Sequence, residues 1–400
     1  MNDVNLHIFG SHDEGTISQI TTCLNAAEGT RGVLSADGHL GYSHPIGGCV
    51  AYPDHISVSG VGFDIACGNM AVRTNLCVQD VELARCMDEI AASIGFGVGR
   101  PNPTPIDHPV FDRIAAAEFA PQRALLHLAR TQLGTVGSGN HYIDLFADEA
   151  DQVWVGVHFG SRGFGHKTAS GFLALAQGGE FGGKFSEGSM HAAPVLLDIH
   201  TTLGQDYLAA MHLAGEYAYA GRETVVAKVL EILGATATTT VHNHHNFAWR
   251  EEHDGQAYWV VRKGCTPAQP GQQGFIGSTM ADISVIVEGV DTPLARQALY
   301  TTVHGAGRVL SRTQAAGKTK WIGGKPVRQG GGLVNYDVVK EALHQQGVEL
   351  RGGAADEAPE CYKKLDEVLA YQGDTIRVLH RLRPIGVAMA SPYEFDPYKD

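Results

Sequence analysis

Side chains that can bind a metal ion or a phosphate group are spread over most of this 400-residue chain. The candidates that stand out, most of them beside glycines, are Asp64, Cys67, His141, His158, His245 and His304. Residues so far apart in sequence can form one site only if the chain folds as a unit around one cleft. The sequence shows no internal repeat and no linker between independent domains. Together these features predict a single large domain.

The stretch 303–308 places a histidine before two glycines that flank an alanine, with an arginine directly after. Because Gly305 and Gly307 lack a Cβ, the backbone there can adopt positive φ and approach a ligand closely. A neutral imidazole can attack phosphorus, and the backbone N–H groups and Arg308 can bind phosphate oxygens. His304 is therefore a candidate covalent nucleophile. The alternative is an ordinary glycine turn with a core histidine.

Asp64 and Cys67 lie three residues apart between glycines, so that a carboxylate and a thiolate can face the same cation. His141 and His158 each adjoin a glycine-rich stretch, and three histidines crowd residues 242–245. One aspartate, one cysteine and three histidines are enough for two metal ions, with the thiolate as the bridge. Ligand softness favours zinc, and the carboxylate leaves room for manganese. A buried free cysteine and satisfied core histidines are the alternative.

The composition restricts the partners and the compartment. A formal charge of -13 leaves no broad basic surface, so a nucleic acid would have to bind in a local basic cleft. Arg162, Lys263 and Arg308 are candidates for phosphate contacts. Seven cysteines without a C-x-x-C pair, and no signal-peptide pattern at the first residues, predict a reducing, cytoplasmic compartment. No apolar run approaches the length of a membrane span, which argues against a membrane partner.

Hydrophobic periodicity predicts the elements around these stretches. Strands are expected at 153–157, 238–241, 259–261 and 284–287. Helices are expected at 81–94, 111–133, 193–202, 204–220, 223–233, 293–301, 337–346 and 359–369. The helix at 293–301 would lead directly to His304. Residues 35–48 mix Asp, His and Gly and are either part of a site or a plain glycine-rich turn capped by Asp37.

As a set, these stretches resemble those of the RtcB-type RNA-splicing ligases, the 3′-phosphate/5′-hydroxyl RNA ligases. The resemblance extends from about Thr16 to Ala390, nearly the whole chain. It rests on seven stretches that occur in family order, at residues 37–39, 62–68, 137–141, 158–163, 244–246, 262–264 and 304–308. Seven in order are far more specific than any one alone.

This resemblance implies an α+β fold: a single large domain with mixed β-sheets and peripheral helices around a deep metal-containing cleft. Residues 1–390 would form the catalytic domain, and residues 391–400 a polar C-terminal tail.

The resemblance also implies a reaction. His304 matches the family histidine that attacks the α-phosphate of GTP, which gives a histidine–GMP phosphoramidate and pyrophosphate. GMP then passes to an RNA 3′-phosphate, a 5′-hydroxyl attacks the activated end, and a phosphodiester forms as GMP leaves. A 2′,3′-cyclic phosphate end is first opened by the same enzyme. The implied context is tRNA splicing or RNA repair, with an archease-type activator in some family members.

Matching positions imply the remaining site residues. Two manganese ions, rather than zinc, would be bound by Asp64, Cys67, His141, His158 and His245, with Cys67 as the bridge. Guanylate contacts would come from Asn140, Asp144, Asn246, Ser278, Gly305, Ala306 and Gly307. Arg162 and Arg308 would hold an RNA phosphate or the polyphosphate.

Two positions in the implied nucleotide pocket depart from the family pattern. Met389 stands where a lysine that reaches the guanylate is expected. Asp144 replaces a guanine-reading glutamate, whose side chain is one methylene longer. Neither departure touches the metal residues or His304. They motivate two alternatives: a divergent paralogue that acts as a cyclic phosphodiesterase, and a nucleotide- or RNA-binding factor that does not ligate.

Overall fold

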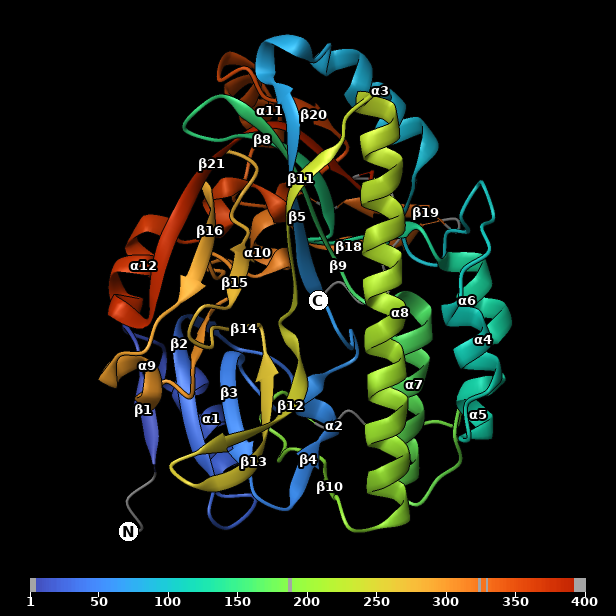
Figure 1. The fold of residues 1–400 in the computed structure, drawn as a ribbon, viewed down its shortest axis with the longest axis vertical. Coiled ribbons are helices and arrows are strands. Elements are labelled where there is room, and N and C mark those ends of the chain that lie inside the picture. Colours follow the sequence, from blue (N-terminus) through green and yellow to red (C-terminus); the bar gives the residue numbers. More distant parts are fainter. Residues whose placement is uncertain (1–4, 186–188, 323–324, 329, 392–400) are drawn as a thin grey trace.

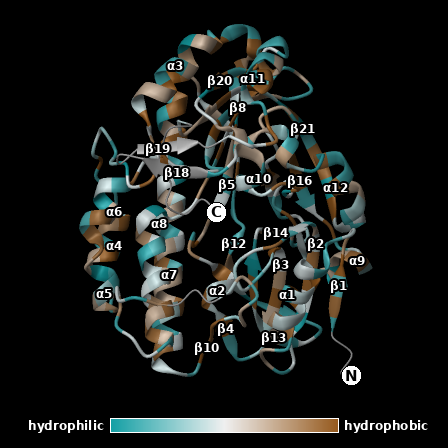
Figure 2. Cartoon of the chain, turned by 180° about the vertical axis from the view of Figure 1, so that it is seen from behind, coloured by the Kyte–Doolittle hydropathy of each residue, from teal (hydrophilic) through white to brown (hydrophobic). Residues whose placement is uncertain are grey.

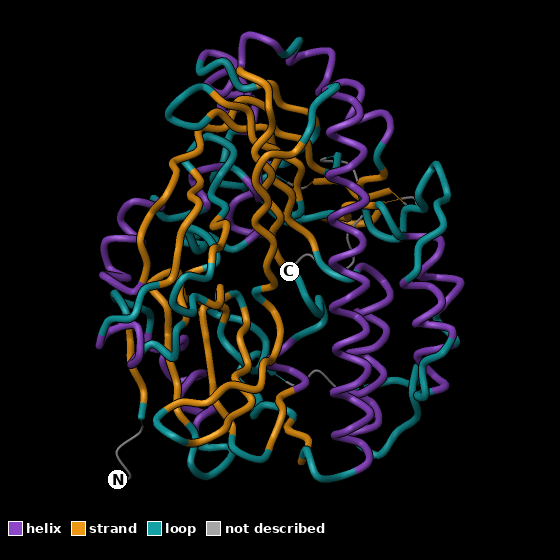
Figure 3. Tube along the Cα trace, viewed as in Figure 1, coloured by secondary structure: helices purple, strands orange, loops and turns teal. Residues whose placement is uncertain are grey.

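The computed structural model describes residues 5–185, 189–322, 325–328 and 330–391. Strands form the centre of the molecule and helices lie around them (Figures 1 and 3). The expected α+β class, with mixed sheets in one domain, is confirmed. Of the predicted tail at 391–400, residues 392–400 lie outside the described residues.

The larger sheet has eight strands. In spatial order they are β11 (Ala237–His244), β5 (Gly68–Cys77), β9 (Gln152–Phe159), β8 (Tyr142–Ala147), β21 (Ile376–Met389), β16 (Ser284–Gly289) and β15 (Gln273–Ile276), with β20 (Glu349–Arg351) beside β21. Successive strands of this order are antiparallel, and β20 is parallel to β21. The two ends of the sheet approach each other, because Asn69 Nδ2 donates to Phe275 O (2.8 Å) and Phe275 N donates to Asn243 Oδ1 (3.2 Å). The sheet is therefore nearly closed.

Both faces of the larger sheet are buried around β9. Its outer face, with Val155, packs in a core cluster against α3 (Leu83–Ser93) and α8 (Thr202–Leu233). On the inner face, Trp154 and Phe275 belong to a separate cluster. A strand covered on both sides reads as a continuous apolar run, which is why residues 153–157 were predictable as a strand.

A second sheet contains the order β1 (Leu6–Ile8), β2 (Arg31–His39), β3 (Ile46–Tyr52), β13 (Gln256–Lys263) and β12 (Asn246–His253). Only His245 separates β11 from β12, so the chain passes directly from one sheet to the other there. The stretch 35–48, for which a plain turn was one interpretation, lies mostly in β2 and β3, with a short connection at 40–45.

Helix α8 is one continuous helix of 32 residues along the larger sheet (Figure 1). The prediction of separate helices at 204–220 and 223–233 was wrong. Gly221 does not interrupt the helix, because the helix lies close to the sheet there: an added Cβ would be 3.4 Å from the Phe159 ring. The predicted helix at 193–202 was also wrong, since it contains β10 (Leu196–Asp198), which pairs with β4 (His55–Ser57).

The single helix predicted at 111–133 is broken into α4 (Val110–Ala115), α5 (Ala120–Arg123) and α6 (Leu126–Gln132). Pro121 lies in the first turn of α5, where its missing N–H is tolerated, and cannot lie inside a longer helix without disrupting it. The helix predicted at 293–301 is likewise shorter: the observed helix, α9 (Pro293–Gln297), ends at Gln297. The strand β17 (Thr301–Val303), rather than the helix, leads to His304.

The remaining elements surround this frame. They are α1 (Glu14–Leu24), α2 (Val58–Val61), β6 (Gly95–Phe96), β7 (Thr135–Gly137), α7 (Arg162–Ala176), β14 (Cys265–Pro267), α10 (Arg312–Ala316), β18 (Thr319–Ile322), β19 (Lys325–Arg328), α11 (Tyr336–Gln345), α12 (Leu365–Gln372) and short 3-10 turns at Val78–Asp80, Ala355–Glu357, Pro359–Cys361 and Gly373–Thr375. Hydrophilic and hydrophobic residues alternate around the peripheral helices (Figure 2). Among the described residues, no helix combines the length and the apolar character needed to cross a membrane.

Candidate functional site

The strand order of the larger sheet brings the candidate metal residues together. Cys67 directly precedes β5, His141 directly precedes β8, and His158 lies one residue from the end of β9. His245 directly follows β11. Because successive strands are antiparallel, the starts of β5 and β8 lie at the same edge of the sheet as the ends of β9 and β11. Residues far apart in sequence thus become neighbours through strand pairing alone.

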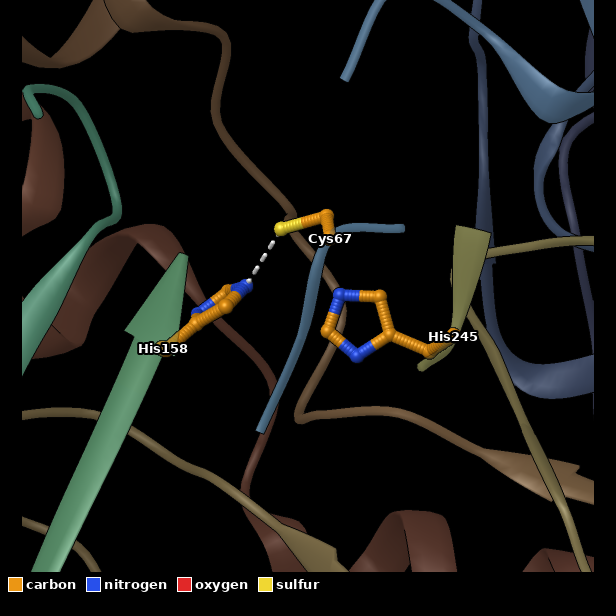
Figure 4. Close-up of side chains that lie close together, drawn as sticks. All are labelled: Cys67, His158 and His245. Atoms are coloured by element: carbon orange, nitrogen blue, oxygen red, sulfur yellow. Dashed lines mark hydrogen bonds between the residues drawn. The ribbon is translucent and has the colours of Figure 1, made fainter. Parts of the chain in front are cut away.

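Among the described residues, three groups of side chains could each hold a metal ion, and the two that include predicted metal residues share Cys67. One is Cys67, His158 and His245, all buried (Figure 4); the other is Asp64, Cys67 and His141. Within each group the candidate ligand atoms lie within 4.8 Å of one another. Cys67 Sγ is 3.2 Å from His158 Nε2 and 3.7 Å from His141 Nε2, and His141 Nε2 is 3.0 Å from Asp64 Oδ2. All five predicted metal residues therefore form one cluster, with the thiol of Cys67 between its halves.

The protonation states of His158, His245 and Asp64 suit a divalent cation. Burial lowers the pKa of His158 and of His245, so both rings are neutral and can offer a lone pair. Burial opposes ionisation of Asp64, but hydrogen bonding to His141 and the charge of Arg162 lower its pKa to about 2. His245 Nδ1 is buried without a hydrogen-bond partner among the described residues, as expected for an atom that awaits a ligand. One thiol, one carboxylate and three imidazoles fit a pair of transition-metal ions.

His304 adjoins this cluster and is oriented by Asp37. The His304 and His245 ring centroids are 4.9 Å apart. Asp37 Oδ2 lies 2.6 Å from His304 Nδ1 and also accepts the backbone N–H groups of His304 (3.0 Å) and Gly305 (3.2 Å). A carboxylate at Nδ1 favours the tautomer that carries its proton there, which leaves the Nε2 lone pair free to attack. From the sequence, residues 35–48 were either part of a site or a turn capped by Asp37, and no contact between Asp37 and His304 was predicted; the signal was the mixture of Asp, His and Gly in that stretch.

The loop after His304 needs its second glycine. Gly307 has a φ of +76°, and a Cβ there would lie 2.4 Å from the backbone oxygen of Asp37. Gly305 is less constrained. Its φ is not in the left-handed region, and the atom nearest to an added Cβ, Gly277 O, would be 3.4 Å away. Gly307 therefore sets the close approach between this loop and β2 that aligns Asp37 with His304.

A pocket of about 600 Å³ opens beside the nucleophile candidate. Its lining includes most of the predicted nucleotide and phosphate residues, namely Asn140, Asp144, Ser278, Gly305, Ala306, Gly307 and Arg308, together with His158, His304 and Met389. The predicted residues Asn246 and Arg162 do not line it. Asn246 instead accepts Gly264 N through Oδ1 (2.7 Å) and donates to Asp64 O (3.4 Å), and Arg162 NH1 lies 3.4 Å from His141 Nδ1. Both therefore contact the metal cluster and its supporting loops.

Part of the pocket lining is an arginine network, of which only Arg308 was predicted from the sequence. Arg308 donates to Tyr362 Oη (2.7 Å), to Asp356 O (2.5 Å) and to Glu357 Oε2 (3.4 Å). Arg312 also binds the carboxylates of Asp356 and Glu357. Residues 356–357 follow no motif that sequence reasoning singled out. Their carboxylates bring two arginines to one side of the pocket.

Another part of the pocket lining comes from the β8–β21 strand pair. Asp144 lies across from Val387, and Tyr142 across from Met389, in the β8–β21 pair. Asp144 Oδ1 and Tyr142 Oη are buried without hydrogen-bond partners among the described residues. Burial raises the pKa of Asp144 well above its ordinary range. None of the described pocket-lining residues is a lysine.

Fold and site together define a class: a single-domain α+β protein in which a shared-cysteine metal cluster and a histidine in a glycine loop face one pocket. A sequence model described as tRNA-splicing ligase RtcB matches residues 21–124 and 113–390. The chain belongs to the RtcB family.

Curated relatives from distant organisms support this assignment. The chain is 31% identical to RNA-splicing ligase RtcB of Escherichia coli strain K12 over 382 residues, which covers 87% of each chain. It is 31% identical to tRNA-splicing ligase RtcB of Archaeoglobus fulgidus, with 89% of this chain and 87% of the relative covered. RNA-splicing ligase RtcB of Mycobacterium bovis is 30% identical, with 88% and 94% covered. Similarity thus extends over nearly the full length of each chain.

Proposed function

We propose that the protein is a GTP- and manganese-dependent RNA ligase that joins 3′-phosphate or 2′,3′-cyclic phosphate ends to 5′-hydroxyl ends through a histidine–GMP intermediate. The observation that carries this proposal is the Asp37–His304 pair, with 2.6 Å between Oδ2 and Nδ1, at the wall of a pocket beside the metal cluster. Family membership, together with relatives named RNA-splicing and tRNA-splicing ligases, supports RNA as the substrate.

Two manganese ions would be held by Asp64, Cys67, His141, His158 and His245, with Cys67 shared. When bound, they would supply positive charge to phosphate oxygens, which is the main requirement of phosphoryl transfer. Family membership, rather than ligand softness, favours manganese over zinc.

In the first step, His304 Nε2 attacks the α-phosphorus of GTP while Asp37 holds the proton on Nδ1. The bond from the α-phosphorus to the bridging oxygen breaks and pyrophosphate leaves, so the nitrogen–phosphorus bond of histidine–GMP replaces a phosphoanhydride bond. Asp37 fixes the ring orientation and stabilises the positive charge that develops on the imidazole. This step needs positioning more than acid–base chemistry.

In the later steps GMP passes to the RNA 3′-phosphate, the 5′-hydroxyl attacks that phosphorus, and GMP leaves as the phosphodiester forms. A cyclic phosphate end is first hydrolysed to the 3′-phosphate. Arg308, with Arg312 beside it, would bind phosphate oxygens on the pocket wall, and Arg162 would act next to His141. These local cations fit a chain whose formal net charge is -13 and whose RNA contacts must be concentrated in one cleft.

The guanylate would lie between the glycine loop and the β8–β21 wall, with contacts from Asn140, Asp144, Ser278, Gly305, Ala306 and Gly307. Asn246, which supports the Asp64 loop, would contribute from the metal side. We further propose that the protein is cytoplasmic, acts in tRNA splicing or RNA repair, and has an archease-type activator as a partner.

A second function, a phosphodiesterase that opens cyclic phosphate ends without joining them, is favoured by Met389 and by the raised pKa of Asp144, because both alter the base-binding side alone. A binding factor without turnover is a weaker alternative, since it would leave the Asp37–His304 pair without a role.

The test is an adduct assay with GTP or ATP labelled on the α-phosphate, in the presence of Mn²⁺. A covalent label that forms with GTP and is absent in His304→Ala supports the ligase. Full labelling of His304→Ala would refute the nucleophile. In a parallel assay, RNA with a 2′,3′-cyclic phosphate that is opened but never joined, without a protein adduct, would favour the phosphodiesterase.

A further inference from the structure

Arg222, a residue outside the pocket, lies fully buried on α8 where this helix crosses behind the metal cluster. Its guanidinium uses every nitrogen. NH1 donates to Ala66 O (3.0 Å) and to Phe159 O (2.6 Å), Nε donates to His242 Nε2 (2.8 Å), and NH2 lies 2.9 Å from His244 Nδ1. One planar group thus spans three segments of chain.

Three of these four acceptors belong to residues directly bonded to candidate metal ligands. Ala66 precedes Cys67, Phe159 follows His158, and His244 precedes His245. The three neighbours, Cys67, His158 and His245, form the buried group of candidate metal ligands in Figure 4. Arg222 therefore links the segments that present this group, namely the turn before β5, the end of β9 and the end of β11, and it does not line the pocket.

The neighbouring histidines support this arrangement. Side chains alternate along a strand, so His242 and His244 point to the same face of β11 and not to that of His245. Both accept from Arg222, which requires neutral rings, and burial together with the arginine charge lowers the pKa of each. Of the three histidines at 242–245, His245 thus belongs to the candidate metal group, and His242 and His244 bind Arg222. Tyr219 adds a ring 5.3 Å from the guanidinium carbon.

Arg222 is also unusual because its charge has no carboxylate partner at ion-pair distance among the described residues. Burial lowers the pKa of Arg222 to about 10, because removing the guanidinium from water disfavours its charged form. Ala66 has a φ of +59°, a conformation that non-glycine residues rarely adopt. The bond from Arg222 to Ala66 O helps to hold this turn immediately before Cys67.

We propose that Arg222 is a positioning residue that fixes Cys67, His158 and His245 relative to one another and thereby sets the affinity of the shared-cysteine metal site. The inference rests on the metal site of the proposed function. Partners that orient metal ligands from behind typically change metal affinity about 10- to 100-fold when they are removed.

The test is a Co²⁺ titration of the metal-stripped full chain, followed by the thiolate-to-cobalt absorption band, for the native protein and for Arg222→Gln and Arg222→Lys. Both variants are expected to bind Co²⁺ about 10- to 100-fold more weakly and with a weaker thiolate band. Arg222→Lys keeps the charge, but one ammonium cannot span acceptors on three strands. Full affinity in Arg222→Lys would show that charge alone matters and would overturn the positioning role.

Arg262 offers a matched control, because it is equally buried but bonds to Glu251, Thr301 and Leu299 O, none of them next to Cys67, His158 or His245. For Arg262→Lys, we expect a lower free energy of unfolding of the metal-free protein, measured in the presence of a chelator, and an unchanged affinity for Co²⁺. An equal loss of affinity in Arg262→Lys, or loss of the fold in both Arg222 variants, would reduce Arg222 to a purely structural residue. A native protein that binds no Co²⁺ would refute the metal site itself, whereas native binding with unchanged Arg222 variants would refute only this inference.

Discussion

The two ends of the pocket differ in how their polar groups are held. At the His304 end, Asp37 Oδ2 accepts three hydrogen bonds and fixes both a side chain and a loop, while Oδ1 of the same carboxylate is buried without a partner among the described residues. At the Asp144 end, Asp144 Oδ1, Tyr142 Oη and Ser278 Oγ are buried without partners among the described residues. Buried polar atoms normally have partners, so such a group of exceptions marks a surface that a ligand completes. Under the proposed function, the nucleophile His304 is already oriented by Asp37, whereas the polar atoms of the Asp144 end would gain their partners from the bound nucleotide.

The largest effect is expected at the His304 end, from Asp37→Asn. The amide cannot stabilise a charged imidazole and favours the wrong tautomer, so histidine–GMP formation should slow by about 100- to 10,000-fold. Single-turnover labelling with GTP measures this rate. Asp148→Asn is the control: this buried carboxylate receives Trp154 Nε1 (3.0 Å) and does not line the pocket, so its loss should leave the rate unchanged. An unimpaired Asp37→Asn would mean that the His304 end is not held by this pair.

Next in size is Gly307→Ala. The added Cβ would meet Asp37 O at 2.4 Å on a backbone with φ of +76°, so the free energy of unfolding should fall by about 1 to 3 kcal/mol. Denaturant unfolding of Gly307→Ala and Gly305→Ala gives the comparison, since a Cβ at position 305 has 3.4 Å of space. Equal stabilities of the two variants would contradict a close loop contact at Asp37.

A smaller effect is expected at the Asp144 end, from Met389→Lys. This change places an ammonium near Asp144 and adds one charged hydrogen-bond donor for a base oxygen. The preference for GTP over ATP in adduct formation should rise by about tenfold, the size of one such bond. Met389→Leu keeps the apolar character and should keep the native ratio. If Met389→Lys left the ratio unchanged, this wall would have no part in reading the base.

The smallest effect is expected from Asp144→Asn. Burial raises the pKa of Asp144, so the folded protein keeps a proton that the unfolded chain loses above its ordinary pKa of 3.8. The free energy of unfolding therefore falls as pH rises from that value through the folded-state pKa. Asn removes this slope and should make the protein relatively more stable at neutral pH, by about 1 kcal/mol or less. Urea unfolding at several pH values measures the free energy of unfolding of both proteins. The same pH dependence in the native protein and in Asp144→Asn would contradict a neutral Asp144.

The chemistry-bearing residues were more predictable than their supports. Asp64, Cys67, His141, His158 and His245 could be singled out because metal ligands are rare residue types in glycine-rich stretches. Their clustering follows from strand pairing, which the sequence does not display. The bridging place of the Cys67 thiol was anticipated from the count of ligands, and the two groups that share it agree with this interpretation.

The residues that support the site without belonging to it could not be predicted, because their roles depend on contacts between residues far apart in the sequence. Arg222 resembles any arginine on an amphipathic helix until the fold places Ala66 and Phe159 beside it. Glu357 becomes important only where Arg308 and Arg312 reach it. The helix errors had a different origin: the effect of Gly221 depends on the neighbouring sheet, whereas Pro121 was a local signal that outweighed the apolar periodicity.

The place of β21 in the larger sheet has a consequence for biosynthesis. This strand, Ile376–Met389, is the last of the sheet to be translated, yet it lies between β8 and β16 in the middle of the strand order. Until it emerges, the nascent chain has two unpaired strand edges and an open pocket wall. Long-range pairings of this kind fold slowly and expose edges to aggregation. The nascent chain therefore cannot complete this wall of the pocket before synthesis has passed residue 389.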